Sequence, residues 1–534
     1  MAPESPPFLA EADDGGFSVL YHGIALYSRV NPRSAPERVA SEFSFHPDTL
    51  YVISSPLLGY GLEIFLSRIP LSCAVLALEL DPALAALSSE RLPRSLLDNP
   101  RFRFLSNAAD CPRAIHDLGR FRRCVEISLS YGRRLHPKAY DRAKASLDAE
   151  LSRYWRNRMT MIHMGRLWLR NLLRNLGRLM DADVRQALPW EVPVVVCGAG
   201  PSLDAALPWI ERERHRIRLV VCDTAVGALS SRGIKPDAVV CLEGQIHNLK
   251  DFLPASGRRF PLFLDLTTHP SSFRAIRGPK ILTLTRFDEL TFLDRLEALR
   301  LPILPVPPLG SVGVLAVHLA QTLTSGPILL TGLDFSFRPG ATHAKGSPAL
   351  TTEGIRENRL YKARSLWNAS YAETPCSSSK EERSNALLSS YADTCASEIQ
   401  GDSRVFDLRP SGIFLGRPRL DFEEASRLLD TSLSDSVSLS AAPAFAPVDR
   451  DAMRSGAAAF LGDERSRLER LLDGLRSRSA DLPELASDCA WIYSWFPDEH
   501  RVLELSGDVR NRLLAEALDW RRRIDEARSA LEEP

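Results

Sequence analysis

Short apolar runs alternate with helical patterns along most of this chain. Between residues 181 and 430 the runs are VPVVVCG, IRLVVCD, PDAVVCLEG, PLFLDL, KILTLT and GPILLTGLDF. Continuous runs of Val, Ile and Leu are typical of strands that are buried on both faces. The pattern therefore predicts an α/β fold, with a Rossmann-like parallel sheet covered by helices, for a central domain at residues 186–430.

A smaller domain of the same type is predicted at residues 1–139. A strand, a turn containing Gly59 and Gly61, a helix and a second apolar strand follow one another, and the second strand ends in Glu79 and Asp81. An acidic residue about twenty positions past a glycine turn is typical of ribose binding, but the glycine spacing does not fit GxGxxG. A nucleotide site and a purely structural domain both remain open.

The other segments are predicted to be helical or irregular. Residues 140–185 form a basic connector helix with Arg166, Arg170, Arg174 and Arg178 in one row. This row either grips an acidic partner or phosphate, or is a solvated face. Residues 431–449 have linker composition, and residues 450–534 have the helical spacing of a small bundle. The serine-rich stretch at 376–395 is a lid or a surface loop.

Composition narrows the class of protein. A chain of 534 residues is long enough for several domains, and its 67 basic residues equal its 67 acidic ones, so no global attraction to nucleic acid or membrane is expected. The nine cysteines contain no CxxC pair, which argues against structural zinc and disulfides. We find neither a signal peptide nor a clean membrane span, and we expect a cytoplasmic protein.

The stretch GAGPSLD is the first candidate for chemistry. Gly198 and Gly200 permit a sharp turn after a strand, and Pro201, Ser202 and Leu203 begin a helix. Backbone N–H groups at a helix start attract anions, so a phosphate is the natural ligand. The spacing is neither a Walker A motif nor a dinucleotide fingerprint, and a structural turn is the alternative.

Two further strand ends carry polar residues. Asp223 and Thr224 follow one strand, and Glu243 and Gln245, with Asn248 close behind, follow the next. Ligands of doubly wound sheets bind beyond the carboxyl ends of the strands, so these side chains are expected near Ser202.

The second half of the domain repeats this architecture. Gly310, Ser311 and Gly313 mark another helix start, which is suited to a carboxylate or phosphate. Asp334 follows the next strand, and its loop carries Thr342 and His343. His343 lies where a general base is expected, although an incidental surface histidine is the alternative.

Taken together, these motifs resemble the motility-associated factor (Maf) glycosyltransferases that modify bacterial flagellin. The resemblance rests on GAGPSLD, on CDTA with GIKPDAVVCLEGQ, on GSVG with GLDFSFRPGATHAKG, and on VFDLRPSGIFLG, and it spans about 250 residues. It implies transfer of a nonulosonic acid of the pseudaminic or legionaminic type, carried on CMP, to Ser or Thr of flagellin. Flagellar assembly and motility would depend on this transfer.

The central domain is also similar to bacterial sialyltransferases that use CMP-sialic acid. The similarity implies that the turn at Gly200 to Leu203 holds the leaving phosphate and that Ser311 holds the donor carboxylate. Asp334 and His343 would be catalytic, with His343 as the base. Ser411 and Gly412 would contact the donor, and Tyr361, Tyr371 or Tyr391 would assist the phosphate. This chain has Ala199 where those enzymes have asparagine, and His343 where they have tyrosine.

Two alternatives stay open beside the transferase. The central domain shares its motif style with archaeal diphosphokinases that act on 6-hydroxymethyl-dihydropterin. Acidic metal-binding pairs near Glu243 would favour this kinase, but the turn reads LEGQ, with a single acid. A non-catalytic flagellin-binding protein on the same fold is the other alternative. For the transferase, no DxD metal motif precedes a suitable strand end, and we expect no obligatory metal or cofactor besides the donor.

Overall fold

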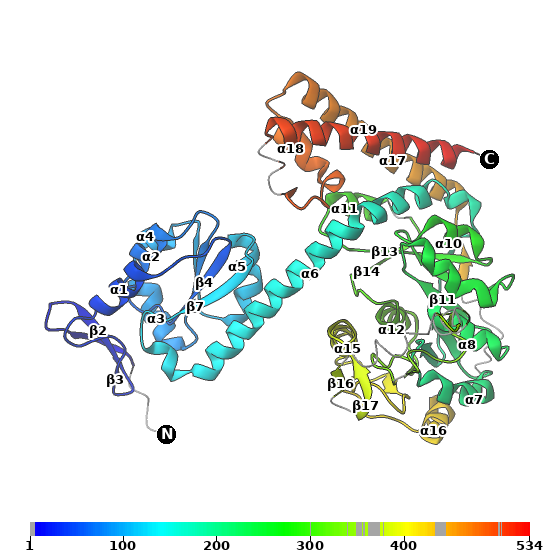
Figure 1. Cartoon of the computed structure of the whole chain (residues 1–534), viewed down its shortest axis with the longest axis horizontal. Helices are drawn as coiled ribbons and strands as arrows, with labels where there is room; N and C mark the ends of the chain where they lie inside the picture. Colours follow the sequence, from blue (N-terminus) through cyan, green and yellow to red (C-terminus); the bar gives the residue numbers. More distant parts are fainter. Residues whose placement is uncertain are drawn as a thin grey trace. The chain divides into compact units, whose positions relative to one another are not determined.

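The computed structural model describes residues 6–299, 301–338, 340–348, 355, 358–360, 374–376, 379–432, 445–499, 502 and 505–533. The chain forms two compact units, Met1–Thr160 and Met161–Pro534 (Figure 1). The 40-residue helix α6 (Pro137–Leu176) belongs to both of them. Among the described residues, no helix is both long and apolar enough to cross a membrane.

The first unit is a small Rossmann-like domain, as predicted. Its parallel sheet has the order β6 (Phe102–Leu105), β5 (Ala74–Leu78), β4 (Thr49–Ser54), β7 (Arg123–Ile127). Its helices are α1 (Ser34–Glu42), α2 (Leu62–Arg68), α3 (Pro82–Arg91), α4 (Arg94–Leu97) and α5 (Cys111–Leu118). A small antiparallel sheet of β1 (Phe8–Glu11), β2 (Phe17–Tyr21) and β3 (Ile24–Ala25) precedes them.

The acidic strand end of this unit is engaged internally. Glu79 is 1% exposed and accepts hydrogen bonds from Ser55 Oγ at 2.6 Å and from the Tyr140 hydroxyl at 2.9 Å. Asp81 caps α3 by accepting from the backbone N–H groups of Ala83 and Leu84. Burial raises the pKa of Glu79. These contacts are those of a structural strand end.

The second unit contains an eight-stranded sheet in which every neighbouring pair is parallel. The order is β14 (Ile303–Val306), β13 (Lys280–Thr285), β12 (Leu262–Asp265), β11 (Ala238–Cys241), β10 (Arg218–Cys222), β9 (Val194–Cys197), β15 (Ile328–Thr331), β18 (Val405–Asp407). Successive strands from β9 to β14 are added on one side, and β15 returns to the other side of β9. The strand order therefore reverses between β9 and β15, which is where doubly wound sheets bind ligands.

Helices cover both faces of this sheet because its strands are apolar on both sides; β9, β10, β11 and β12 are entirely buried. One face packs against α7 (Leu203–Glu213), α8 (Val226–Ser231), α10 (Pro270–Ala275), α11 (Thr291–Ala298) and the second half of α6. The other face packs against α12 (Val312–Leu323) and α15 (Ala386–Glu398). The short helix α9 (Leu249–Phe252) follows β11, and α16 (Phe422–Ser432) follows β18.

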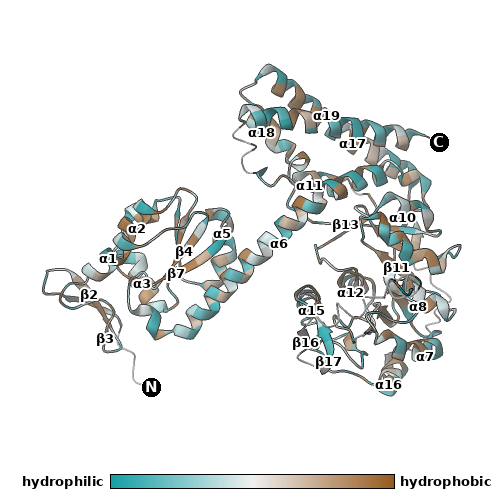
Figure 2. Ribbon diagram, viewed as in Figure 1, coloured by the Kyte–Doolittle hydropathy of each residue, from teal (hydrophilic) through white to brown (hydrophobic). Residues whose placement is uncertain are grey.

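The predicted C-terminal helical domain is present. It consists of α17 (Arg450–Ser477), α18 (Leu482–Asp488) and α19 (Gly507–Glu532), and its apolar side joins the core that covers the sheet. Figure 2 shows brown hydrophobic positions alternating with teal hydrophilic ones along α17 and α19. Before it, β19 (Phe445–Pro447) pairs antiparallel with β8 (Arg185–Ala187). Residues 433–444 of the predicted linker lie outside the described residues.

A buried ion pair joins this domain to the sheet. Glu464 on α17 is 0% exposed, and Arg295 on α11 donates to both of its oxygens, at 2.6 and 3.0 Å. The indole N–H of Trp491 also donates to Glu464, at 3.0 Å. A buried carboxylate depends on such partners because the low-dielectric interior cannot solvate it.

We predict that Arg295→Ala lowers the free energy of unfolding by about 3 kcal/mol, since it leaves Glu464 buried without its main partner. Denaturant unfolding measures this change. The double variant Arg295→Met with Glu464→Leu is expected to recover most of the loss. An equal loss in the single and double variants would contradict the role given to the pair.

Candidate active site

The candidate site lies where the strand order reverses, at the carboxyl ends of β9 and β15. The turn after β9 is hydrogen-bonded to the loop after β15. Gly198 N–H donates to the carbonyl of Thr331 at 2.8 Å, and Gly200 N–H donates to the carbonyl of Gly332 at 2.7 Å. The turn after β9 and the loop after β15 therefore form one continuous surface, which we call the floor of the site.

Glycine is required on both sides of this contact. A Cβ atom on Gly198 would lie 2.3 Å from the carbonyl oxygen of Gly332. Gly332 has a φ of +65°, and a Cβ there would lie 2.1 Å from the carbonyl oxygen of Gly198. Any side chain at either position would push the backbones apart.

Asp334 occupies the start of helix α7. Its Oδ2 atom accepts from Ser202 N–H at 2.7 Å, and its Oδ1 atom accepts from the Ser202 hydroxyl. The Ser202 hydroxyl in turn accepts from Gly332 N–H at 3.1 Å. Burial raises the pKa of Asp334 to about 6. Both carboxylate oxygens are thus engaged with the turn, which makes Asp334 a positioning residue here, while its expected catalytic role stays a prediction.

The N–H groups of the predicted phosphate site already have partners within the protein. Besides the N–H groups of Gly198, Gly200 and Ser202, those of Leu203 and Asp204 are also engaged, donating within the turn to the carbonyls of Gly200 and Pro201. The sequence predicts an external anion at this turn, with a structural turn as the alternative. In the structure the Asp334 carboxylate accepts hydrogen bonds from the turn, and the phosphate site stays a prediction.

The second predicted helix start is open. Ser311 is the N-cap of the 12-residue helix α12, with extended backbone angles and no capping hydrogen bond from its side chain. Among the described residues, no partner of its hydroxyl is found. The first N–H groups of any helix lack intrahelical partners, so this hydroxyl and the α12 N-terminus together offer donors to an anion.

Close packing holds the start of α12 beside the floor. A Cβ atom on Gly313 would lie 2.6 Å from the Leu333 side chain, and one on Gly310, whose φ is +71°, would lie 3.3 Å from the Tyr391 ring. Tyr391 projects from α15, and burial together with the Glu243 carboxylate raises its pKa. The other two tyrosines that the sialyltransferase similarity suggests, Tyr361 and Tyr371, lie outside the described residues.

The strand ends after β10 and β11 supply acidic and amide groups. Asp223 accepts from Thr224 N–H at 2.8 Å and from the Asn248 amide at 2.7 Å, and Asn248 also donates to Asp251 at 3.3 Å. Burial raises the pKa of Asp223, and burial with the Asp223 charge raises that of Asp251 to about 6.

The Glu243 turn is exposed beside these groups. Glu243 accepts from Gln245 N–H at 2.9 Å, and both side chains are exposed. Among the described residues, no three His, Cys, Asp or Glu side chains form a cluster that could hold a metal ion.

The loop with His343 is tied to the floor on the other side. Ala344 N–H donates to the carbonyl of Ala199 at 2.8 Å, and Lys345 N–H donates to Asp204 at 3.0 Å. The Nδ1 atom of His343 lies 3.1 Å from Thr342 Oγ1. Burial and the Lys250 ammonium lower the pKa of His343, so its imidazole is neutral near pH 7 and able to accept a proton.

Ser411 and Gly412 follow β18, and Gly412 packs against the loop after β15. Gly412 has a φ of +99°, and a Cβ there would lie 2.8 Å from the Asp334 backbone. Its N–H donates to the buried Glu382 at 3.2 Å, and the fully buried Arg409 pairs with Asp407 at 2.8 Å. The sequence did not single out Glu382 or Arg409. The sequence indicates Arg409 only through its place in the run DLRP. Glu382 lies in the serine-rich stretch at 376–395, which gives no indication of a buried carboxylate.

We predict that Asp334→Ala destabilises the second unit by about 3 kcal/mol, because it leaves buried donors of Ser202 unpaired. Thermal and urea unfolding measure this loss, and Asp334→Asn is expected to lose less. The pKa of Asp334 in the folded protein, about 6, lies above the ordinary value of 3.8 for an aspartate, so the protonated form favours folding. That stability is present below pH 3.8 and lost as pH rises through 6. The advantage of the wild type over Asp334→Asn should shrink over this range, and a constant difference would contradict the assignment.

Comparisons with known proteins agree with this architecture. Residues 170–340 match the family described as 6-hydroxymethylpterin diphosphokinase MptE-like. A protein of Treponema pallidum (strain Nichols) described as uncharacterized is 33% identical over 355 residues, 65% of this chain and 62% of that protein. A second such protein from that organism is 29% identical over 86 residues, 16% of this chain and 40% of its own.

A solved structure extends the comparison to the whole chain. The Maf glycosyltransferase from Magnetospirillum magneticum AMB-1 superposes with a TM-score of 0.60 at 13% identity. The match covers 100% of this chain and 94% of that one. Residues 170–340 thus carry the MptE-like match, and the chain as a whole has the fold of a Maf glycosyltransferase.

Proposed function

We propose that the chain is a glycosyltransferase that moves a nonulosonic acid of the pseudaminic or legionaminic type from a CMP-activated donor to Ser or Thr of flagellin. The observation that carries this proposal is the pair of groups at the reversal of strand order: an open helix start at Ser311 and a neutral imidazole at His343. The shared fold with a Maf glycosyltransferase supports it.

The start of α12 suits an anionic group of the donor. CMP leaves as a phosphate, and negative charge grows on its oxygen as the glycosidic bond breaks. Hydrogen-bond donors that the fold already holds at a helix start stabilise this charge without having to reorganise. Because Asp334 fills the start of α7, we assign the donor's phosphate or carboxylate to Ser311 and α12. The exposed Glu243 and Gln245 are then available for hydroxyl groups of the donor.

His343 is the proposed base. It takes the proton of the acceptor hydroxyl while the acceptor oxygen bonds to the anomeric carbon and the bond from that carbon to the phosphate oxygen breaks. This direct displacement inverts the anomeric configuration and needs no cofactor besides the donor. With Nδ1 beside Thr342 Oγ1, Nε2 is the nitrogen assigned to the acceptor.

A diphosphokinase that uses ATP with magnesium is the second candidate. The family match at residues 170–340 favours it, and so does the acidic pair Asp223 and Asp251 near Glu243. However, these two residues are 2% and 7% exposed and share the Asn248 amide. This arrangement resembles an internal hydrogen-bond network more than an open magnesium site.

We predict that CMP binds the full chain and that Ser311→Asp weakens its affinity about tenfold or more, because the new carboxylate occupies the helix start. Aspartate is a good N-cap, so the melting temperature should not fall. Calorimetric titration measures the affinity. Ser506→Asp, at the uncapped N-cap of α19, is the matched control and should bind CMP normally. Preference for ATP with magnesium would favour the kinase, and no nucleotide binding would favour a flagellin-binding protein.

We predict that His343→Gln slows transfer to flagellin by about 10²- to 10⁴-fold while leaving CMP affinity unchanged. Since burial lowers the pKa of His343 below 6.5, the wild-type rate should be flat above pH 6.5 and fall only at lower pH, as the imidazole takes up a proton. Rates measured with CMP-linked donor and purified flagellin test both statements. A variant with wild-type rates would remove His343 from the mechanism.

A further inference from the structure

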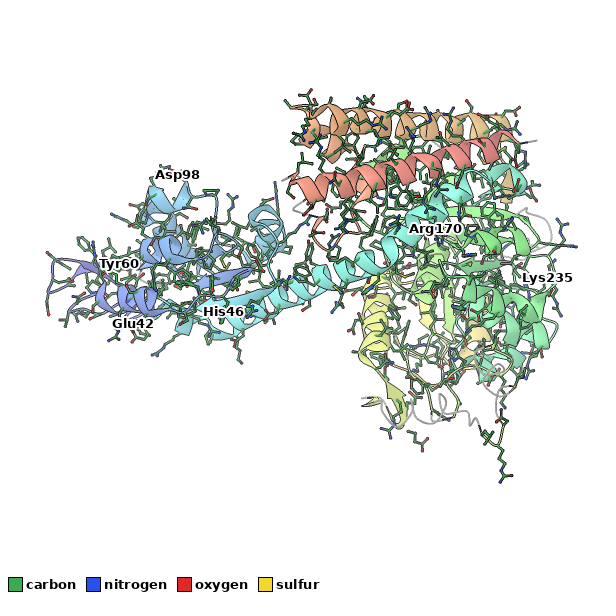
Figure 3. All side chains as sticks on the ribbon, turned by 45° about the horizontal axis from the view of Figure 1, so that its top comes forward. Glu42, His46, Tyr60, Asp98, Arg170 and Lys235 are labelled. Atoms are coloured by element: carbon green, nitrogen blue, oxygen red, sulfur yellow. The ribbon has the colours of Figure 1, made fainter. Side chains whose placement is uncertain are left out.

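A basic cavity lies on the second unit, between α6, α10 and α19. Its volume is about 380 Å³. The charged and titratable residues of its lining are Arg170, Arg174, Arg178, Arg274, Arg523, His269 and Glu526. Figure 3 labels Arg170 on α6. Pockets of this size hold small molecules, and this one is lined mainly by positive charge.

The one carboxylate in this lining does not neutralise the arginines of the lining. Glu526 pairs with Arg522, outside the lining, while Arg178 pairs with Asp181 at 3.1 Å and Arg523 with Asp519 at 2.8 Å. Among the described residues, Arg170, Arg174 and Arg274 have no carboxylate within ion-pair distance. The Nε atom of Arg170 is buried without a hydrogen-bond partner. Like charges gathered in this way repel each other unless an anion joins them.

The walls of the cavity are held in place by other contacts. Asn175 on α6 donates to the carbonyls of Leu266 and Thr268, both at 2.8 Å, and thereby fixes the loop before α10. On the opposite wall, a Cβ on Gly177 would lie 2.6 Å from the Ala527 carbonyl oxygen, so this glycine lets α19 approach α6 closely. The fold therefore brings these arginines together, with Arg170 partly buried and Arg174 and Arg274 exposed at the mouth of the cavity.

The histidine of the lining is oriented as a donor. His269 Nδ1 accepts from Ser271 N–H at 3.2 Å, so in the neutral ring the proton is on Nε2. Burial and the charges of Arg170, Arg174 and Arg274 lower the pKa of His269. An uncharged imidazole with an N–H on Nε2 can add a hydrogen bond for an anion without adding to the repulsion.

We propose that this cavity binds a small molecule with two neighbouring anionic groups of the phosphate class. Planar guanidinium groups bind phosphate oxygens in pairs, and each phosphate group carries about one to two negative charges near neutral pH. Two such groups match the three guanidiniums of Arg170, Arg174 and Arg274, whereas one carboxylate compensates only one of them.

The cavity is separate from the proposed donor site. It adjoins the loop after β12, which lies three strands from β9, about 14 Å at the usual strand spacing. The loop after β11 links the two regions, because Glu243 accepts from His269 N–H at 3.2 Å through its carbonyl oxygen. A ligand in the cavity therefore contacts the carboxyl edge of the same sheet as the donor.

Calorimetric titration of the full chain with inorganic pyrophosphate tests this proposal. We expect binding by the wild type and a loss of about tenfold or more in Arg174→Gln with Arg274→Gln. The exposed arginines Arg427 and Arg454 supply a matched control, since changing both to Gln removes the same charge elsewhere and should leave the affinity unchanged. Ser311→Asp should also retain pyrophosphate binding, even if the proposed donor site fails.

Thermal unfolding supplies a second readout. Without ligand, the Arg174→Gln with Arg274→Gln variant should melt at the wild-type temperature or above, because it removes repulsion. Pyrophosphate should raise the melting temperature of the wild type and not that of the variant. No wild-type binding at millimolar pyrophosphate, equal affinity in the variant, or loss only in Ser311→Asp would overturn the proposal.

Discussion

The close approach of two backbones at Gly198 and Gly332 determines the arrangement of the carboxyl edge of the sheet. With no side chain between them, the turn after β9 and the loop after β15 exchange hydrogen bonds, and Asp334 reaches the start of α7. The same turn receives the N–H of Ala344, which places His343 at this edge. A change in the glycine contact would therefore move the candidate base and the floor together.

The two helix starts at this edge have different electrostatic states. Above its pKa of about 6, Asp334 supplies a negative charge to the start of α7, whereas the Ser311 hydroxyl at the start of α12 has no partner among the described residues. An anionic ligand is therefore repelled from one and attracted to the other. This asymmetry would orient a donor that carries both a phosphate and a carboxylate, because only one of its charged groups finds a strong partner at the floor.

Local signals in the sequence predicted the layers and strand ends, but not the partners of the strand ends. Runs such as VVVC identify buried strands because both of their faces must be apolar. The turn at Ser202 was recognised as a helix start, yet its occupant lies 132 residues further along the chain, and nothing local indicates it. Glu382 was missed for a similar reason: it lies in a polar stretch, and only folding buries it behind Gly412.

The arginine row on α6 shows the same limit. Sequence spacing places these residues on one side of a helix, but their roles depend on α19 and α10, which lie far away in the chain. Arg166 pairs with Glu516 and Asp519, while Arg170 and Arg174 line the basic cavity. The row is therefore neither solvated along its whole length nor a binding surface along its whole length.

Helix α6 has a consequence for any attempt to separate the two units. Residues 140–151 of the helix bury Tyr140, Leu147 and Leu151 in the first unit, and its last turns bury Leu172 and Leu176 in the second. No loop marks the boundary at Thr160, so a fragment that begins there starts in the middle of a helix. Its first N–H groups would lose their partners, and an added capping residue would be needed to keep that end helical.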